Sequence, residues 1–223
     1  MVVAAGASMT QGSLGHDWVG DLRAKPEFRG YAFVNAGDNG NTSADLLGRV
    51  DRDIVACAPD RVTILIGAND LRDGVPSEEF RANLGAIVDR IKDKTSARIA
   101  LLSLPPAGED LDSEINGRLR DYNAVIKEAA TRATVDYVPV NERFADHLRD
   151  QGQRPTYDFG FTTAYLAATK YYLLGDSWDE VARDNGLELF VDHLHLSDRG
   201  GAMVTHLVAQ WPASAEGAMR SRP

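Results

Sequence analysis

Short apolar runs alternate with longer amphipathic segments over the first two-thirds of the chain. Five of these runs are expected to form β-strands, because they combine strand length with a high content of Val, Ile and Leu. They are Val2–Ala5, Tyr31–Asn35, Val62–Ile66, Ile99–Ser103 and Val135–Val140. The third and fourth runs are almost continuously apolar, which is typical of parallel strands that are buried on both faces.

Apolar residues between the later runs recur at helical spacing. Two sets of five show it: Phe80, Leu84, Ile87, Val88, Ile91, and Ile115, Leu119, Tyr122, Ile126, Ala129. Ser77, Glu78 and Glu79 mark the start of the first of these helices, because acidic side chains favour the positive end of the helix dipole. The alternation of strand and helix predicts a parallel sheet with helices on both faces, an α/β/α sandwich.

Residues 142–190 break this alternation and are expected to form a helical insertion or cap. The aromatic stretch within them, residues 159–174, is interpreted either as packing or a dimer surface, or as a cap that lines an acyl pocket. A last helix is expected from the apolar periodicity of Met203, Leu207, Val208 and Trp211, with Ser197 as its cap and Pro212 at its end. The sequence therefore predicts one domain over 1–211 and a disordered tail over 212–223.

Composition narrows the function classes. The 223 residues suit one domain, and the net charge is −9, with 24 basic and 33 acidic residues and no basic cluster. A nucleic-acid partner is therefore not expected, since phosphate binding needs concentrated Lys and Arg. The single cysteine, Cys57, excludes an internal disulfide. No run reaches the roughly 18 apolar residues of a membrane span, and no signal peptide is recognisable at the start, so a cytoplasmic location is expected.

Four short segments carry the candidate chemistry. They are Gly6-Ala7-Ser8, the Asn35–Gly40 segment with Gly37, Gly67-Ala68-Asn69-Asp70, and Asp192-His193-Leu194-His195. The first three follow the first three strands, and the carboxyl ends of parallel strands share one edge of a sheet, where ligands bind. The fourth precedes the last helix and reaches the same edge only if its loop folds back.

These segments supply the parts of a serine esterase. Ser8 is the candidate nucleophile, His195 its general base, and Asp192 the acid that orients the imidazole. The amides of Ser8 and Gly37 and the side-chain amide of Asn69 are candidate donors to an oxyanion hole.

Together the four segments resemble the sequence blocks of the SGNH hydrolases, also called GDSL-type esterases and lipases. This resemblance implies a flavodoxin-like sheet and hydrolysis of small-molecule carboxylic esters through an acyl-enzyme, with no metal or other cofactor. It covers residues 1–103 and 190–211 well and 142–190 poorly. The chain departs from the pattern at Ala7, where the family usually has aspartate.

Simpler interpretations exist for each segment. Ser8 could be only a helix cap, and Asn69-Asp70 only a turn. A literal Gly-Asp-Ser occurs at 175–177, but Ser177 and Glu180 fit a helix capping box, and no strand precedes them. Asp192, His193 and His195 could suggest a metal pair, although no second cluster supports one. His193 is expected either at the rim of the site or in packing, and Asp70 is expected to be structural.

Three alternatives to ester hydrolysis remain at this stage. Ala7 leaves open a catalytically weak or silent binding module on the same fold. A nucleotide-binding role is disfavoured because neither glycine-rich phosphate motif is present. Within the enzyme class, an acyltransferase or a carbohydrate deacetylase stays open, as does a homo-oligomeric state.

Overall fold

The computed structural model describes residues 1–149 and 154–220. Its centre is a five-stranded, all-parallel sheet with the strand order β2-β1-β3-β4-β5. The strands are β1 (Val2–Gly6), β2 (Phe33–Gly37), β3 (Arg61–Leu65), β4 (Arg98–Leu102) and β5 (Asp136–Val138). This order is the flavodoxin-like one, and it confirms the expected fold class.

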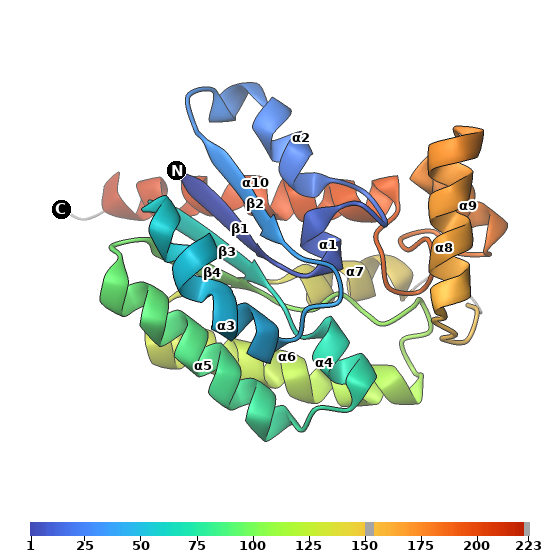
Figure 1. The fold of residues 1–223 in the computed structure, drawn as a ribbon, viewed down its shortest axis with the longest axis horizontal. Coiled ribbons are helices and arrows are strands. Elements are labelled where there is room, and N and C mark those ends of the chain that lie inside the picture. Colours follow the sequence, from blue (N-terminus) through green and yellow to red (C-terminus); the bar gives the residue numbers. More distant parts are fainter. Residues whose placement is uncertain (150–153, 221–223) are drawn as a thin grey trace.

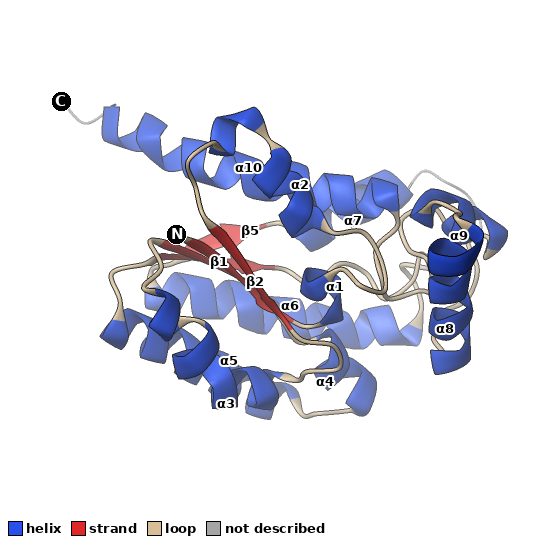
Figure 2. Ribbon diagram, turned by 45° about the horizontal axis from the view of Figure 1, so that its top comes forward, coloured by secondary structure: helices blue, strands red, loops and turns tan. Residues whose placement is uncertain are grey.

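Helices cover both faces of the sheet and complete the three layers (Figures 1 and 2). One layer contains α3 (Ser43–Asp53), α5 (Ser77–Lys94) and α6 (Glu114–Ala133). The other contains α2 (Trp18–Ala24), α7 (Val140–Leu148) and α10 (Asp198–Arg220). Two short 3₁₀ turns, η1 (Pro26–Phe28) and η2 (Val55–Cys57), precede β2 and β3.

The core lies between the sheet and these two layers. All five residues of β1 are buried, as expected for an inner strand that carries helices on both sides. On one side, the Phe80 ring of α5 stacks on Tyr122 of α6 with centroids 4.8 Å apart. On the other, the indole of Trp18 is almost completely buried beneath α10. This rigid framework positions the loops at the carboxyl edge of the sheet.

The segment expected to be an insertion is helical where the structure describes it. It contains the end of α7, then α8 (Phe161–Thr169), the π-helical turn η3 (Lys170–Leu174) and α9 (Trp178–Asp184). Residues 150–153 lie outside the described residues. Ser177 caps α9, since its side chain and that of Glu180 form the expected capping box. The literal Gly-Asp-Ser is therefore a helix start.

Several boundaries differ from the sequence-based expectation; β5, for example, ends at Val138 and not at Val140. Strand β2 begins and ends two residues later than expected, which moves Gly37 from the loop into the strand. Helix α10 does not end at Pro212 but continues to Arg220. The residues after the proline include Ala213, Ala215 and Ala218, which have high helix propensity, so one lost hydrogen bond does not end the helix. Residues 221–223, at the end of the expected disordered tail, are outside the described residues.

Among the described helices, none combines the length and the apolar character that crossing a membrane requires.

Candidate active site

Ser8 lies immediately beyond the carboxyl end of β1, as the first residue of the short helix α1 (Ser8–Gln11). The turn between strand and helix is tight: a Cβ at Gly6 would overlap both the Thr10 hydroxyl and the Leu65 carbonyl oxygen. Only glycine fits this close approach of two backbones. The turn thereby holds Ser8 at a fixed place on the edge of the sheet.

The Ala7 departure leaves this turn intact. The Ala7 carbonyl accepts hydrogen bonds from Thr10 N at 3.0 Å and Gln11 N at 2.9 Å. Two side chains brace the helix from outside, since Trp18 Nε1 donates to Met9 O at 2.9 Å and Asn35 Nδ2 to Thr10 O at 2.7 Å. Backbone and neighbouring groups therefore hold α1 without a carboxylate at position 7.

The three predicted catalytic side chains meet in one hydrogen-bonded chain. Ser8 Oγ lies 2.9 Å from His195 Nε2, and His195 Nδ1 lies 2.7 Å from Asp192 Oδ2. All three residues are buried, with Asp192 completely so. The second carboxylate oxygen, Asp192 Oδ1, accepts the backbone N–H groups of Leu194 and His195 at 3.1 and 2.8 Å. The carboxylate therefore fixes both the ring and the backbone of the histidine.

The loop with Asp192 and His195 folds back over the sheet edge, as the function requires. Its ends are joined where Val191 N donates to His195 O at 2.8 Å. Neighbouring loops anchor it through Gly108 N to His193 O at 2.7 Å and His16 N to Leu196 O at 2.9 Å. His193 has a positive φ of 68°, a strained backbone that the tight fold-back imposes.

His193 and two aromatic residues enclose the catalytic histidine. His193 is buried, which lowers its pKa below the ordinary histidine value. Its ring packs edge-on against Tyr157, and the Phe159 ring lies 6.0 Å from that of His195, centroid to centroid. Burial, with the nearby Asp192 charge, raises the pKa of Tyr157 to about 12. Tyr157 therefore remains a neutral wall of the site.

Asn69 lies in the first turn of α4 (Ala68–Asp73), beside the loop that follows β2. Its Nδ2 donates to Asn41 O at 2.9 Å, and a side-chain amide has a second N–H available. The carboxylate of Asp70, a residue expected to be structural, accepts hydrogen bonds from Ser43 N at 2.9 Å and from Ser43 Oγ at 2.5 Å. Burial raises the pKa of this carboxyl, although the Ser43 hydrogen bonds oppose the shift.

The predicted role of Gly37 is not supported. Its N–H already donates to Asn35 Oδ1 at 3.0 Å, because Gly37 is the last residue of the edge strand β2 and not part of the loop. Three residues later, Gly40 has a φ of 78° and open space where a Cβ would lie. Within the described residues its N–H has no acceptor. Sequence reasoning did not identify Gly40 as a donor.

Sequence reasoning missed Arg49, a buried residue of α3. Its guanidinium donates to Gly6 O at 2.8 Å, Ala36 O at 3.0 Å and Asn41 Oδ1 at 2.7 Å. It thus connects the ends of β1 and β2 to Asn41, whose carbonyl oxygen accepts a hydrogen bond from Asn69. A lone arginine in an amphipathic helix gives no sequence signal for such a role.

A small apolar pocket lies against the loops that carry the site. Met9, Ala68 and Leu194, the sequence neighbours of Ser8, Asn69 and His195, line it together with Leu71, Pro105, Pro106, Ala107, Ile115, Leu119 and Tyr157. It leaves only about 10 Å³ in which the centre of a water-sized sphere can lie. The pocket can therefore receive a group of about methyl size.

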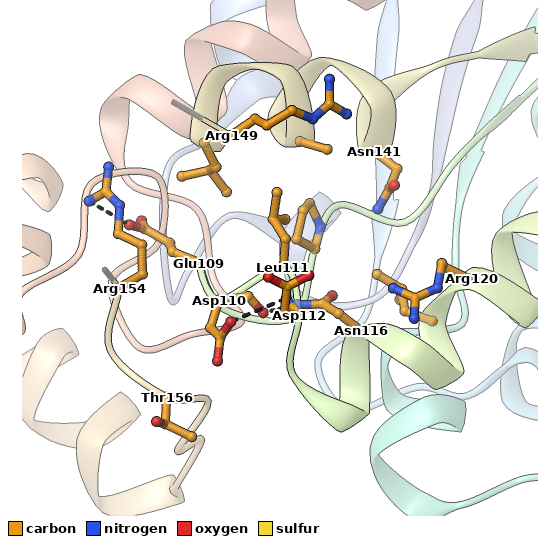
Figure 3. A pocket seen from close by; sticks show the side chains of 14 residues that line it. Glu109, Asp110, Leu111, Asp112, Asn116, Arg120, Asn141, Arg149, Arg154 and Thr156 are labelled. Atoms are coloured by element: carbon orange, nitrogen blue, oxygen red, sulfur yellow. Dashed lines mark hydrogen bonds and ion pairs between the residues drawn. The ribbon is translucent and has the colours of Figure 1, made fainter. Parts of the chain in front are cut away.

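A larger, polar cavity of about 640 Å³ shares Pro106 and Leu119 with the small pocket. Figure 3 shows this cavity from close by. Charged side chains surround it, including Asp110, Asp112, Arg120 and Arg149. Glu109 and Arg154 form an ion pair at 3.1 Å in its wall. Unlike the small pocket, this cavity is lined neither by the triad residues nor by their sequence neighbours, so we assign it no part in the chemistry.

The comparison with protein families decides the classification. The sequence model of the GDSL-like lipase/acylhydrolase family matches residues 4–203. The chain belongs to this family. The resemblance inferred from the four segments is thereby confirmed, and with it the class of carboxylic ester hydrolases.

Relatives of this GDSL-type chain include characterised esterases. An acetylxylan esterase from Geobacillus stearothermophilus is 28% identical over 141 residues, which are 59% of this chain and 64% of that protein. The match thus spans just under two thirds of that esterase.

Solved structures show the same fold. The acetyl xylan esterase AlAXEase has a TM-score of 0.69 at 21% identity, covering 95% of this chain and 98% of its own. Axe2, an acetylxylan esterase from Geobacillus stearothermophilus, has a TM-score of 0.68 at 21% identity, covering 94% of this chain and 92% of its own.

Proposed function

We propose that the protein hydrolyses acetyl esters of small, hydroxyl-rich molecules, such as acetylated sugars, through an acetyl-enzyme on Ser8. The observation that carries the acyl part of this proposal is the small volume of the apolar pocket beside the site, about 10 Å³. Each added methylene needs extra space in such a pocket. An acetyl methyl fits there, and a longer chain does not.

The chemistry follows from the order of the hydrogen-bonded chain. Ser8 Oγ attacks the ester carbonyl while His195 Nε2 takes its proton, and Asp192 stabilises the imidazolium that forms. Collapse of the tetrahedral intermediate expels the alcohol, to which His195 returns the proton. Water, deprotonated by the same histidine, then attacks the acetyl-enzyme and releases acetate.

The developing oxyanion needs N–H donors close to Ser8. The Ser8 N–H has no acceptor within the described residues, and Asn69 retains one side-chain N–H beyond its bond to Asn41. We assign the third donor to the Gly40 N–H, because the Gly37 N–H is already used. Losing one such donor typically slows the reaction about 10²–10³-fold.

The alcohol part of the proposal comes from the relatives. They are named acetylxylan esterases, and we extend this name to acetylated sugars as substrates of the present chain. The triad is complete, so a silent binding module is not favoured.

The test is a chain-length series of nitrophenyl esters, from acetate to octanoate, followed by acetylated xylose oligomers. We expect the highest kcat/KM on acetate, a fall of about tenfold or more per step as the chain lengthens, and release of acetate from the oligomers. An optimum on octanoate would refute the acetyl assignment. Hydrolysis of nitrophenyl acetate without acetate release from the oligomers would refute the sugar assignment alone.

A further inference from the structure

The helix that follows Tyr157 and Phe159 has a largely exposed apolar surface. Helix α8 and the turn η3 expose seven large apolar or aromatic side chains, and we call this surface the α8–η3 face. It consists of Phe161, Tyr165, Leu166, Tyr171, Tyr172, Leu173 and Leu174. Elsewhere among the residues whose burial is described, Tyr31 is the one large hydrophobic residue that is exposed.

The exposure of this face is unusually high for such residues. Phe161 is 75% exposed, Leu173 78% and Leu174 70%. Given the usual areas of these side chains, the face offers roughly 800 Å² of apolar surface. The largest such patch on a typical monomer covers about 300–600 Å², and a stable protein–protein interface buries about 800 Å² on each partner. The area is therefore that of one half of a stable interface.

The composition of the face favours a protein partner over a membrane surface. Four of the seven side chains are aromatic, a type that is enriched at the centres of protein interfaces. Helices that lie on membranes are rich in Lys and Arg on their polar side. Between residues 161 and 174 the one charged residue is Lys170, which is paired with Asp184 of α9 at 2.6 Å. With a net charge of −9, the chain is also repelled by anionic lipid.

The position of the face allows two molecules to meet through it. Figures 1 and 2 show α8 on the outside of the fold, at the end opposite to the N-terminus and clear of both helix layers. The helix is held at both ends: Tyr172 Oη donates to Ser13 O at 2.9 Å, and the Arg72 guanidinium lies 5.6 Å from the centre of the Phe161 ring. It is thus fixed to the rim of the active site.

We propose that the α8–η3 face binds the same face of a second copy and forms a two-fold symmetric dimer. Pairing of a face with itself is the usual solution for homodimers, and it covers the apolar surface of both copies at once. Residues 157–161 lead directly into α8 and carry Phe159, whose ring packs beside His195. The dimer interface therefore lies directly behind the wall of the active site.

The test is the mass of the full chain in solution, measured by sedimentation equilibrium over a wide range of concentrations. Tyr165→Glu and Leu173→Glu each place a charge within the face, and Tyr31→Glu is the matched control at an exposed tyrosine outside the face. The wild type and Tyr31→Glu should sediment as dimers of the 24.3 kDa chain. The two face variants should dissociate at least roughly 30-fold more easily, as loss of a central interface residue does. Their circular dichroism should remain that of the wild type.

Three results would overturn the proposal. One is a wild type that is monomeric at every concentration, and another is a dimer that both face variants leave intact, which would place the interface elsewhere. The third is a monomeric wild type that binds phosphatidylcholine vesicles and loses this binding in Tyr165→Glu, which would assign the face to lipid. The association is measured without any ester, so its failure leaves the proposed function untouched.

Discussion

The Arg49 guanidinium donates a 2.8 Å hydrogen bond to the carbonyl oxygen of Gly6, two residues before the nucleophile. The same group binds Ala36 O and the side chain of Asn41. The buried guanidinium thus fixes the distance between the end of β1, which precedes Ser8, and the loop after β2. In that loop, the Asn41 carbonyl oxygen accepts a hydrogen bond from Asn69. The geometry of the oxyanion hole depends on a residue outside it.

We expect Arg49→Lys to lower both stability and turnover. A lysine keeps the charge, but its single ammonium group cannot reproduce the planar fork that binds three acceptors. Leaving buried carbonyl oxygens without donors should cost about 2 kcal/mol or more of unfolding free energy. Urea titration and steady-state kinetics measure the two effects. Arg52→Lys, at an exposed position of the same helix, is the control. Equal stability and equal turnover of Arg49→Lys and Arg52→Lys would contradict the role assigned to Arg49.

Asn69→Ala tests the oxyanion hole. The substitution removes the side-chain N–H assigned to the transition state, so we expect kcat on nitrophenyl acetate to fall about 10²–10³-fold with little change in KM. Gly37→Ala should act differently, because its Cβ would overlap the backbone of Gln11 and displace α1. It should lower the melting temperature as well as kcat. A stable Gly37→Ala protein with wild-type structure and a selective loss of kcat would restore Gly37 as a donor.

The acyl pocket can be enlarged at a half-buried wall residue. Ile115→Ala removes three carbon atoms from the lining, so butyrate should gain relative to acetate by roughly tenfold in the ratio of kcat/KM values. Leu207→Ala, at a partly buried position of α10 away from the pocket, controls for the loss of apolar volume as such. An unchanged acetate preference in Ile115→Ala would show that this pocket does not hold the acyl chain.

His16 should make stability depend on pH. Burial lowers its pKa, but the hydrogen bonds and charges of Asp198 and Asp21 outweigh burial, and the net pKa is raised. A raised pKa means that the charged histidine stabilises the fold below about pH 6.5, the unfolded value, and that this contribution is lost as the pH rises through the folded pKa. The imidazole joins α2 to the start of α10 at 2.8 and 2.9 Å.

The measurement is the unfolding free energy of wild type and His16→Gln at about pH 6 and about pH 9. The difference between the two proteins should be larger at the lower pH. His206→Gln, at an exposed position of α10, should show no such change. If His16→Gln loses the same unfolding free energy at both pH values, the predicted pH dependence is contradicted.

The strands and helices could be predicted from the sequence more accurately than the residues at which they begin and end. The five strands follow from short apolar runs, of which the third and fourth are almost continuous in Val, Ile and Leu, and their parallel arrangement follows from the helices between them. The limits of β2 could not be read, because Asn35, Ala36 and Gly37 have weak strand propensity and are held in the strand by pairing with β1. That two-residue error placed Gly37 in the loop and made it a candidate donor to the oxyanion hole. The end of α10 was misjudged because a proline was given more weight than the alanines after it.

The sequence indicated the candidate residues of the site, of which the structure brings Ser8, His195 and Asp192 together, but it did not indicate the residues that support them. Ser8, Asn69, Asp192 and His195 stand in short motifs whose residue types state their chemistry. The contact between Ser8 and His195 spans 187 residues and depends on backbone hydrogen bonds, such as Gly108 to His193, that leave no pattern in the sequence. Arg49 and the small acyl pocket likewise arise only when distant segments pack together.

The most direct test of the central claim is turnover of nitrophenyl acetate by wild type, Ser8→Ala and Ser177→Ala. Ser177 belongs to the literal Gly-Asp-Ser and caps α9, so it is the matched control. We predict that Ser8→Ala loses at least about 10³-fold in kcat, whereas Ser177→Ala keeps wild-type kcat and loses about 1 kcal/mol of stability. Wild-type turnover by Ser8→Ala would contradict the assignment of the nucleophile.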